Sequence, residues 1–288
     1  MAGTYDRRRQ DIGNILALEH VNVWVPDQRT ATAFYVTGLG LTRDPYVMVG
    51  TENMWINVGA HQFHLPTNTP QVLRGVVGLV LQHFDALPAQ LESVRDELAG
   101  TQFAWSVEDK HVAVTSPWGN RLRCYAPGPW GDLTLGMVYV EFPVAAGAAD
   151  GIARFYRSVM GAPASVTREA TGVAARVVVG HHQELIFRET GAPIEPYDGH
   201  HIAIYIANFS GPHAWLAERG LVTEESGEHQ YRFVAIVDPD TRAPLFEIEH
   251  EVRSLTHPMA FRPLVNRNPA QRQRTYARGR DAFTPDAG

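Results

Sequence analysis

The sequence has little of several features that would by themselves define a class of protein. Only one of its 288 residues, Cys124, is a cysteine, so no internal disulfide framework can form and a reducing, cytoplasmic location is expected. No apolar run approaches the roughly 20 residues of a membrane helix, and no apolar segment follows the N-terminal arginines as it would in a signal peptide. The net charge of −6 disfavours sequence-independent nucleic-acid binding. These absences predict that neither nucleic acid nor a membrane is a partner.

What the chain does contain is an internal repeat. The segment LEHVNVWVPDQRTATAFYVTGLGL at 18–41 is echoed by MVYVEFPVAAGAADGIARFYRSVMGAP at 137–163. The segment GAHQFHLP at 59–66 is echoed by GHHQELIF at 180–187. Self-similarity of this length indicates a fold assembled from copies of one unit.

Hydrophobic patterning and turn residues divide each half of the chain into strand, helix and three strands, twice over. The four units are expected to open near 20–25, 75–81, 138–144 and 200–206, and to close near 61–66, 121–125, 184–188 and 245–252. Unit one has further strands expected near 45–50 and 53–58, and the four helices are expected near 28–38, 86–98, 148–160 and 211–219. The predicted organisation is an extension (1–14), two domains of two βαβββ units each (15–128 and 133–254) and a tail (255–288).

Three segments resemble the vicinal oxygen chelate superfamily, which includes glyoxalase I, extradiol dioxygenases and bleomycin and fosfomycin resistance proteins. They are HVNVWVPD followed by a helix containing FY, the strand GAHQFHLP, and the closing turns SPWGNRLRCY and DPDTRAPLFEIEH. The resemblance spans roughly residues 15–254. It implies an α+β fold in which pairs of units form half-barrel cups. It also implies a metal inside a cup, held by the first and last strands of the paired units.

At those positions unit one has His20 and His64, and unit four has His201 and Glu249, with Glu247 as the alternative one pleat away. Units two and three offer almost no ligands. If unit one pairs with unit four, one cup is complete and the other is empty; if neighbouring units pair, each cup holds half a site. The first arrangement is favoured because it explains every placement with one assumption, and the second stays open.

Period-two alternation agrees with these candidates, because it separates each histidine from the apolar face of its strand. The acids of the last strand share one face, so alternation alone does not decide which of them is a ligand. The residues expected beside the ligands inside the cup are Asn22, Gln62 and Tyr205. His229 and Tyr231, on a middle strand, are candidate acid/base groups, and a packing role suits them equally well.

Three imidazoles and one carboxylate suit a borderline divalent metal, with Fe(II) favoured and Mn, Co, Ni or Zn as alternatives. Such a set leaves two adjacent positions for a substrate that chelates through oxygens, or for substrate and O2 together. We therefore predict a mononuclear metal-dependent enzyme of the non-haem Fe(II) dioxygenase type. The alternatives are a glyoxalase-like isomerase or lyase and a metal-free binding or resistance protein. A homodimer is a further open alternative.

Overall fold

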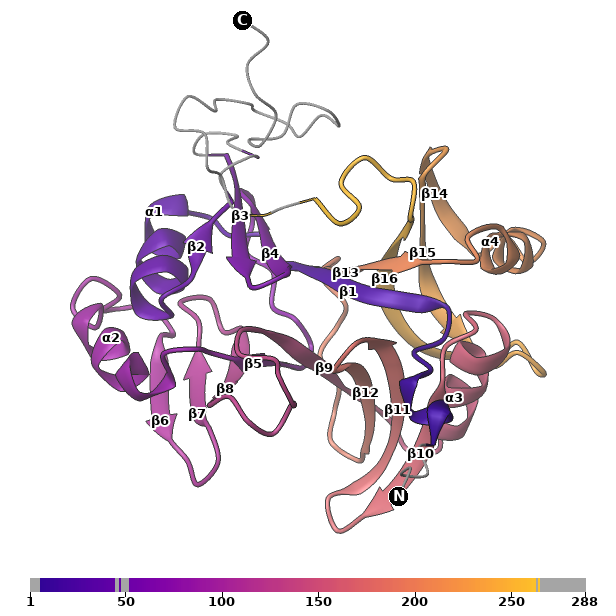
Figure 1. The fold of residues 1–288 in the computed structure, drawn as a ribbon, viewed down its shortest axis with the longest axis horizontal. Helices are drawn as coiled ribbons and strands as arrows, with labels where there is room; N and C mark the ends of the chain where they lie inside the picture. Colours follow the sequence, from indigo (N-terminus) through magenta and orange to yellow (C-terminus); the bar gives the residue numbers. More distant parts are fainter. Residues whose placement is uncertain (1–5, 45–46, 48–51, 263, 265–288) are drawn as a thin grey trace, which may run out of the picture.

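The computed structural model describes residues 6–44, 47, 52–262 and 264, and contains two eight-stranded mixed sheets, one above the other in Figure 1. The strand order is β14-β15-β16-β13-β1-β4-β3-β2 in the first sheet and β10-β11-β12-β9-β5-β8-β7-β6 in the second. The first sheet therefore combines the opening and closing quarters of the chain, and the second combines the two middle quarters.

Units one and four make up the first sheet. After a short 3-10 helix (Arg7–Gln10), unit one comprises β1 (Ile15–Asn22), α1 (Gln28–Ala31), the π-helix η2 (Thr32–Gly38), β2 (Thr42–Arg43), β3 (Asn53–Val58) and β4 (His61–Pro66). Unit four comprises β13 (His201–Ile206), α4 (Ser210–Ala217), β14 (Val222–Gly227), β15 (Gln230–Val237) and β16 (Pro244–Ser254). The strand expected near 45–50 falls mostly outside the described residues.

Units two and three make up the second sheet. Unit two comprises β5 (Val76–Val80), η3 (Phe84–Ala86), α2 (Leu87–Ser93), β6 (Ala104–Val107), β7 (Val112–Thr115) and β8 (Arg121–Tyr125). Unit three comprises β9 (Gly136–Ala145), α3 (Ala149–Ser158), β10 (Ala164–Glu169), β11 (Gly172–Gly180) and β12 (Gln183–Thr190). The expectation of an α+β fold built from four βαβββ units is confirmed.

The opening strands of the units join each sheet at its centre. Strand β1 pairs antiparallel with β13, and β5 pairs antiparallel with β9. Unit one therefore shares a sheet with unit four, as the ligand positions in the sequence favoured. The proposed halves 15–128 and 133–254 each supply one unit to each sheet.

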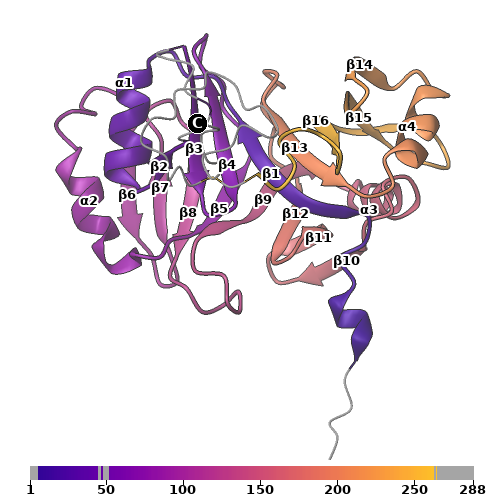
Figure 2. The ribbon, with the colours of Figure 1, turned by 45° about the horizontal axis from the view of Figure 1, so that its top comes forward.

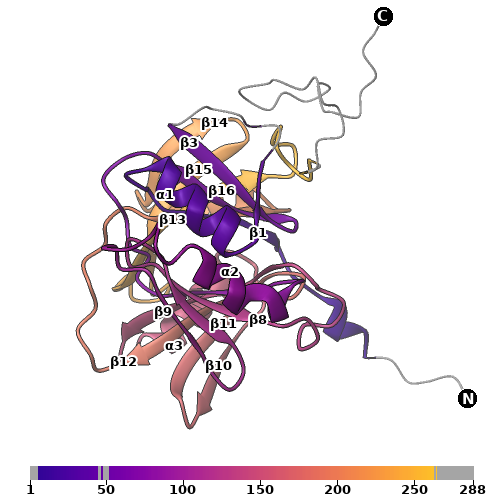
Figure 3. The same ribbon diagram turned by 90° about the vertical axis from the view of Figure 1, so that its left-hand side faces the viewer.

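The apolar faces of both sheets contribute to one large core. The isoleucines of β13 and Val21 of β1 are buried there, together with aromatic side chains of the helices. Helix α2 contacts η2 at one end of the molecule, whereas α3 contacts strands of both sheets, including β11 and β15, at the other (Figure 2). Figure 3 looks at the molecule from the end where α1 and α2 lie. This packing leaves the opposite face of each sheet free to hold side chains for a site.

The first helical segment begins where the sequence predicts it. The Asp27 carboxylate caps α1 by accepting hydrogen bonds from the backbone N–H groups of Arg29 (3.1 Å) and Thr30 (2.8 Å). Phe34 and Tyr35 are fully buried against the sheet, as expected from their spacing. Among the described residues, no helix is long and apolar enough to span a membrane.

Candidate metal centre

Three imidazoles from three strands meet on one face of the first sheet, which we call the first cup. His20 lies on β1, His64 on β4 and His201 on β13. One ring nitrogen of each lies within 4.8 Å of the corresponding atoms of the other two. The Nε2 atoms of all three rings are buried and make no hydrogen bond within the described residues. Since metal–imidazole bonds are about 2.0–2.1 Å, nitrogens this close can share one ion.

The strand register explains how residues so far apart in sequence meet. Asn22 of β1 lies opposite His64 of the parallel strand β4. It also lies opposite His201 of the antiparallel strand β13. His20 is two residues before Asn22 and therefore projects from the same face of β1. The three predicted histidines are thus brought together by the pairing of unit one with unit four.

A β-bulge adds Glu19 to the first cup, which the sequence analysis missed. The β1–β13 register shifts between Leu18 and His20, so Glu19 is an extra residue on its strand. Its carboxylate lies against Nδ1 of His20 in a short contact. Burial alone would raise the pKa of Glu19, but the neighbouring Arg253 guanidinium and His20 lower it to about 2. The carboxylate is therefore the acceptor, Nδ1 carries the proton, and Nε2 is left to bind a metal.

His64 is positioned by a hydrogen bond and by ring stacking. Its Nδ1 lies 2.7 Å from the side-chain amide of Asn22, and its ring stacks on Trp55 with centroids 3.8 Å apart. Burial holds the pKa of His64 well below its usual value, so the ring is neutral. Asn22 can orient its carbonyl oxygen toward Nδ1–H, because the oxygen and nitrogen of an amide exchange by a simple flip. Asn22 thus has the supporting place expected for it.

His201 lies between two carboxylates of β16. Its Nδ1 is 3.3 Å from Oε1 of Glu249, and its Nε2 is 3.4 Å from Oε2 of Glu251. Burial is the main reason that the pKa of His201 falls to about 4, so this ring is also neutral near pH 7. A neutral imidazole with a free Nε2 is the form that binds divalent metals.

The register makes Glu251, rather than Glu249, the counterpart of His64. In unit one, His64 lies opposite the residue two positions after His20. In unit four, the residue two positions after His201 is Ala203, and it lies opposite Glu251. Residue Glu251 is only 3% exposed. Glu249 lies opposite His201 itself, with its side chain 22% exposed.

Arginines hold both of these carboxylates. Arg232 of β15 makes short ion pairs with Glu249 and Glu251. Arg253 lies 2.5 Å from the second oxygen of Glu251 and donates to Glu19 at 2.9 Å. Burial opposes ionisation of Glu251, but Arg253 and His201 hold its pKa well below the usual value. The centre therefore contains three imidazoles, of which those of His64 and His201 are neutral, and an ionised carboxylate. The alternative ligand Glu247 is exposed and precedes the segment of β16 that pairs with β13.

Tyr205 and the two acid/base candidates, His229 and Tyr231, have different positions. Tyr205 faces the first cup, with its hydroxyl 3.4 Å from a nitrogen of Arg253. Tyr231 lies on the other face of its sheet, where its ring contacts Phe209 and His213 beside α4. The expectation that Tyr231 faces the cup is therefore wrong, because it pairs with Val252 rather than with a residue of the cup face.

His229 precedes β15 and does not reach the three imidazoles. Its ring nitrogens lie 3.1 Å from the Thr256 hydroxyl and 3.0 Å from the Glu228 carboxylate. This places it at the end of the strand, where it joins the start of the C-terminal segment. We therefore assign His229 no part in the chemistry of the first cup.

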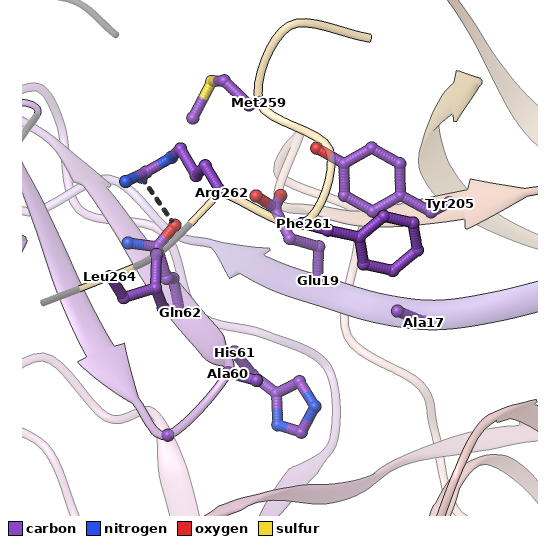
Figure 4. Close-up of a pocket in the computed structure, with 11 residues that line it drawn as sticks. Ala17, Glu19, Ala60, His61, Gln62, Tyr205, Met259, Phe261, Arg262 and Leu264 are labelled. Atoms are coloured by element: carbon purple, nitrogen blue, oxygen red, sulfur yellow. Dashed lines mark hydrogen bonds between the residues drawn. The ribbon is translucent and has the colours of Figure 1, made fainter. Parts of the chain in front are cut away.

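A cavity of about 450 Å³ lies at one end of the first cup (Figure 4). Glu19, whose carboxylate contacts His20, lines the cavity together with Gln62 and Tyr205, and Met259, Phe261 and Arg262 of the C-terminal segment cover it. The buried Arg262 guanidinium contacts Asp44 and lies 3.3 Å from Gln62 Oε1. Because its charged groups are paired within the wall, the cavity offers mainly apolar and aromatic surface to a ligand.

A second group with metal-binding side chains lies at the surface. It consists of Asp132, His181 and His182, of which the first two are exposed. His182 Nε2 lies 3.4 Å from Asp132 Oδ1, but the Asp132 side chain is 89% exposed, so this group is open to solvent, unlike the three imidazoles of the first cup.

No protein-family model matches the chain, and no curated protein matches it either. Solved structures do match. Glyoxalase I from Zea mays covers 87% of this chain and 95% of its own at a TM-score of 0.57 and 12% identity. A "putative dioxygenase" from Bacillus subtilis covers 84% of this chain and 86% of its own at a TM-score of 0.54 and 16% identity. These similarities show the fold alone, and they agree with the fold that the resemblance in the sequence implies.

Proposed function

We propose that this chain is a mononuclear metal-dependent enzyme of the non-haem Fe(II) dioxygenase type, acting on a small substrate that chelates through oxygens. The observation that carries the proposal is the convergence of three imidazoles whose Nε2 atoms are buried and make no hydrogen bond within the described residues. His20, His64, His201 and Glu251 would hold the metal. A bound metal of this kind supplies Lewis acidity and, for iron, a means of activating O2.

Oxidation is favoured over isomerisation by the state of the carboxylates. A glyoxalase-like reaction needs a base that can accept a substrate proton. Glu251 is held by Arg232 and Arg253, Glu19 by Arg253 and His20, and Glu249 by Arg232, so none of these three carboxylates is free to serve as that base. These residues can instead fix the imidazoles and their protonation state. The cavity beside Tyr205 would accept the apolar part of a substrate and exclude water from it.

The test is the metal content of the full chain, purified without oxygen or chelators and measured by elemental analysis. We expect about one iron or similar ion per chain and the loss of that ion in both His20→Ala and His201→Ala. Glu251→Gln should weaken metal retention by roughly 10- to 100-fold. Glu249→Gln makes the same change on the same face of β16, and because the amide oxygen can still accept from Nδ1 of His201, it should lose less metal than Glu251→Gln.

An oxygen-uptake screen with catechol-like and 2-oxo acid substrates then tests the reaction class. Metal without oxygen uptake, but with isomerase or lyase activity, would replace the dioxygenase by the glyoxalase-like alternative. A chain that neither contains nor takes up metal would make the cup a metal-free binding site. Equal metal loss in Glu249→Gln and Glu251→Gln would contradict the register argument for Glu251.

A further inference from the structure

The second sheet has a face equivalent to the first cup, which we call the second cup. In the first cup, Asn22 lies opposite two ligand positions, one on β4 and one on β13. In the second sheet, Gly78 of β5 lies opposite Arg123 of β8 and Tyr139 of β9 in the same way. Arg123 is therefore the counterpart of His64, and Tyr139 is the counterpart of the unit-four histidine.

The other two ligand positions are apolar. Val76, two residues before Gly78, corresponds to His20 of the first cup. Ile186 lies opposite Glu141 of β9, as Glu251 lies opposite Ala203. The four positions that hold three histidines and a glutamate in the first cup thus hold valine, arginine, tyrosine and isoleucine in the second.

Tyr139 fills the centre of the second cup. Its ring lies across Gly78 so closely that a Cβ atom on this glycine would be 2.3 Å from the ring. Its hydroxyl is 2.8 Å from the hydroxyl of Tyr125. The described residues of the second cup therefore provide no set of metal ligands, and a ring occupies the corresponding space.

Arg123 brings a permanent positive charge to a position that holds a metal ligand in the first cup. Its side chain is 37% exposed and lies 3.7 Å from the Glu141 carboxylate. Glu141 is also paired with Arg188 at 3.0 Å. Arg121, two residues from Arg123 on the same face of β8, donates to the backbone oxygen of Gly75 and makes no ion pair within the described residues. Arg123 and Arg188 thus share the Glu141 carboxylate, Arg176 and Glu184 pair with each other, and Arg121 adds a further cation, so the second cup carries excess positive charge.

A cavity of about 290 Å³ lies beside these arginines. Ala113 lies opposite Arg123, and Thr115 lies opposite Arg121, so these side chains share one face of the sheet. Small side chains keep the floor open in front of the guanidinium groups. Val76, Ala104, Ser106, Ala113 and Thr115 line it.

We propose that the second cup is a metal-free binding site for a small organic carboxylate. The guanidinium groups of Arg123 and Arg121 pair with the carboxylate oxygens, because an arginine fork matches the geometry of a carboxylate. The apolar body of the ligand lies over Val76 and the alanines. In the second cup, a fixed arginine cation thus attracts the ligand oxygens, as a metal would in the first cup. The proposal does not depend on metal binding or catalysis in the first cup.

The test is calorimetric titration of benzoate into the full chain after removal of metals with a chelator. We expect saturable binding that weakens at least tenfold in Arg123→Gln, because a charge-assisted hydrogen bond is lost. Arg123→Lys should retain part of the affinity, since it keeps the charge but not the fork. Arg157→Gln, on the exposed side of α3, is the control and should bind as the wild type does.

Arg121→Gln tests the proposal independently of any folding defect in Arg123 variants, because this side chain is exposed. We expect its affinity to fall at least threefold. Unchanged affinity in Arg121→Gln, or no saturable benzoate binding by the wild type, would overturn the proposal. Inorganic phosphate binding more tightly than benzoate would overturn the choice of a carboxylate. Binding that is lost in His201→Ala and kept in Arg123→Gln would place benzoate in the first cup and overturn the proposal.

Discussion

Replacing Arg253 by methionine tests the electrostatics of the first cup most directly. The Arg253 side chain is 6% exposed and serves four groups: Glu19 at 2.9 Å, Glu251 at 2.5 Å, Gln230 at 3.1 Å and the Tyr205 hydroxyl at 3.4 Å. Methionine keeps much of the side-chain volume but removes the charge. Glu19 and Glu251, whose side chains are 10% and 4% exposed, would then lie buried with reduced compensation.

The expected loss of stability follows from the free energy needed to leave a buried charge unpaired. Removing one partner of a buried ion pair typically costs about 3–5 kcal/mol. Glu251 retains Arg232, so most of this loss should come from Glu19. We therefore expect the free energy of unfolding of the metal-free protein to fall by about 3–5 kcal/mol in Arg253→Met. Adding Glu19→Gln to this variant should recover part of the loss.

A bound metal should offset part of this defect. Arg253 and a divalent ion would share the Glu251 carboxylate and repel each other, so loss of the arginine removes a repulsive interaction. The stabilisation produced by saturating metal should therefore be larger in Arg253→Met than in the wild type, by roughly 1.4 kcal/mol or a tenfold change in affinity. Urea denaturation with and without the metal measures both quantities.

A matched control is Arg154→Met. Arg154 pairs with Asp238 and Asp240, but its side chain is 41% exposed. Exposed ion pairs contribute about 0–1 kcal/mol, so this variant should lose little stability. The reasoning would be refuted if Arg253→Met cost no more than Arg154→Met, or if metal stabilised Arg253→Met less than the wild type.

Two further predictions concern the core and the second sheet. Burial lowers the pKa of His250 to about 4, so the unfolded chain takes up a proton between pH 6.5 and 4 that the folded chain excludes. This contribution to stability is present above pH 6.5 and is lost as the pH falls, by about 2 kcal/mol between pH 7 and 5. Urea denaturation of His250→Phe should therefore show a shallower dependence of stability on pH than the wild type. An unchanged pH dependence would contradict the assignment to His250. In the second sheet, Gly75→Ala should destabilise more than Gly78→Ala, because its Cβ would lie 2.1 Å from the Glu141 backbone oxygen whereas that of Gly78 meets the Tyr139 ring, which can shift. Thermal unfolding of the two variants checks the order, and equal melting temperatures would refute it.

Much of the architecture could be read from the sequence because the repeat and the alternation of apolar residues are local signals. The units, their order and the three histidines of the first cup all depend on such signals. Even the pairing of unit one with unit four was favoured, because only that pairing gathers the ligand positions into one cup. The structure adds the geometry, with ring nitrogens within 4.8 Å of one another.

The residues that sequence reasoning misplaced depend on long-range pairing. Glu249 and Glu251 share a face of β16, so only the register between β16 and β13 distinguishes them. Glu19 reaches the first cup through a bulge, which breaks the alternation that predicts side-chain direction. Tyr231 could have been placed correctly, because it shares its face of β15 with the buried Phe233 rather than with Arg232.

The two halves that repeat in the sequence do not correspond to the two cups in the structure. Each half of the sequence contributes one opening strand to each sheet, so neither half contains a complete first cup. The imidazoles of the cup come from strands at both ends of the chain, and they meet across the β1–β13 pair. A metal bound there would link His20 and Glu251 directly, and would stabilise the pairing of the terminal units as well as the site. Since the second cup forms from the middle units, its side chains, Arg123 among them, can differ from those of the first cup without disturbing that site.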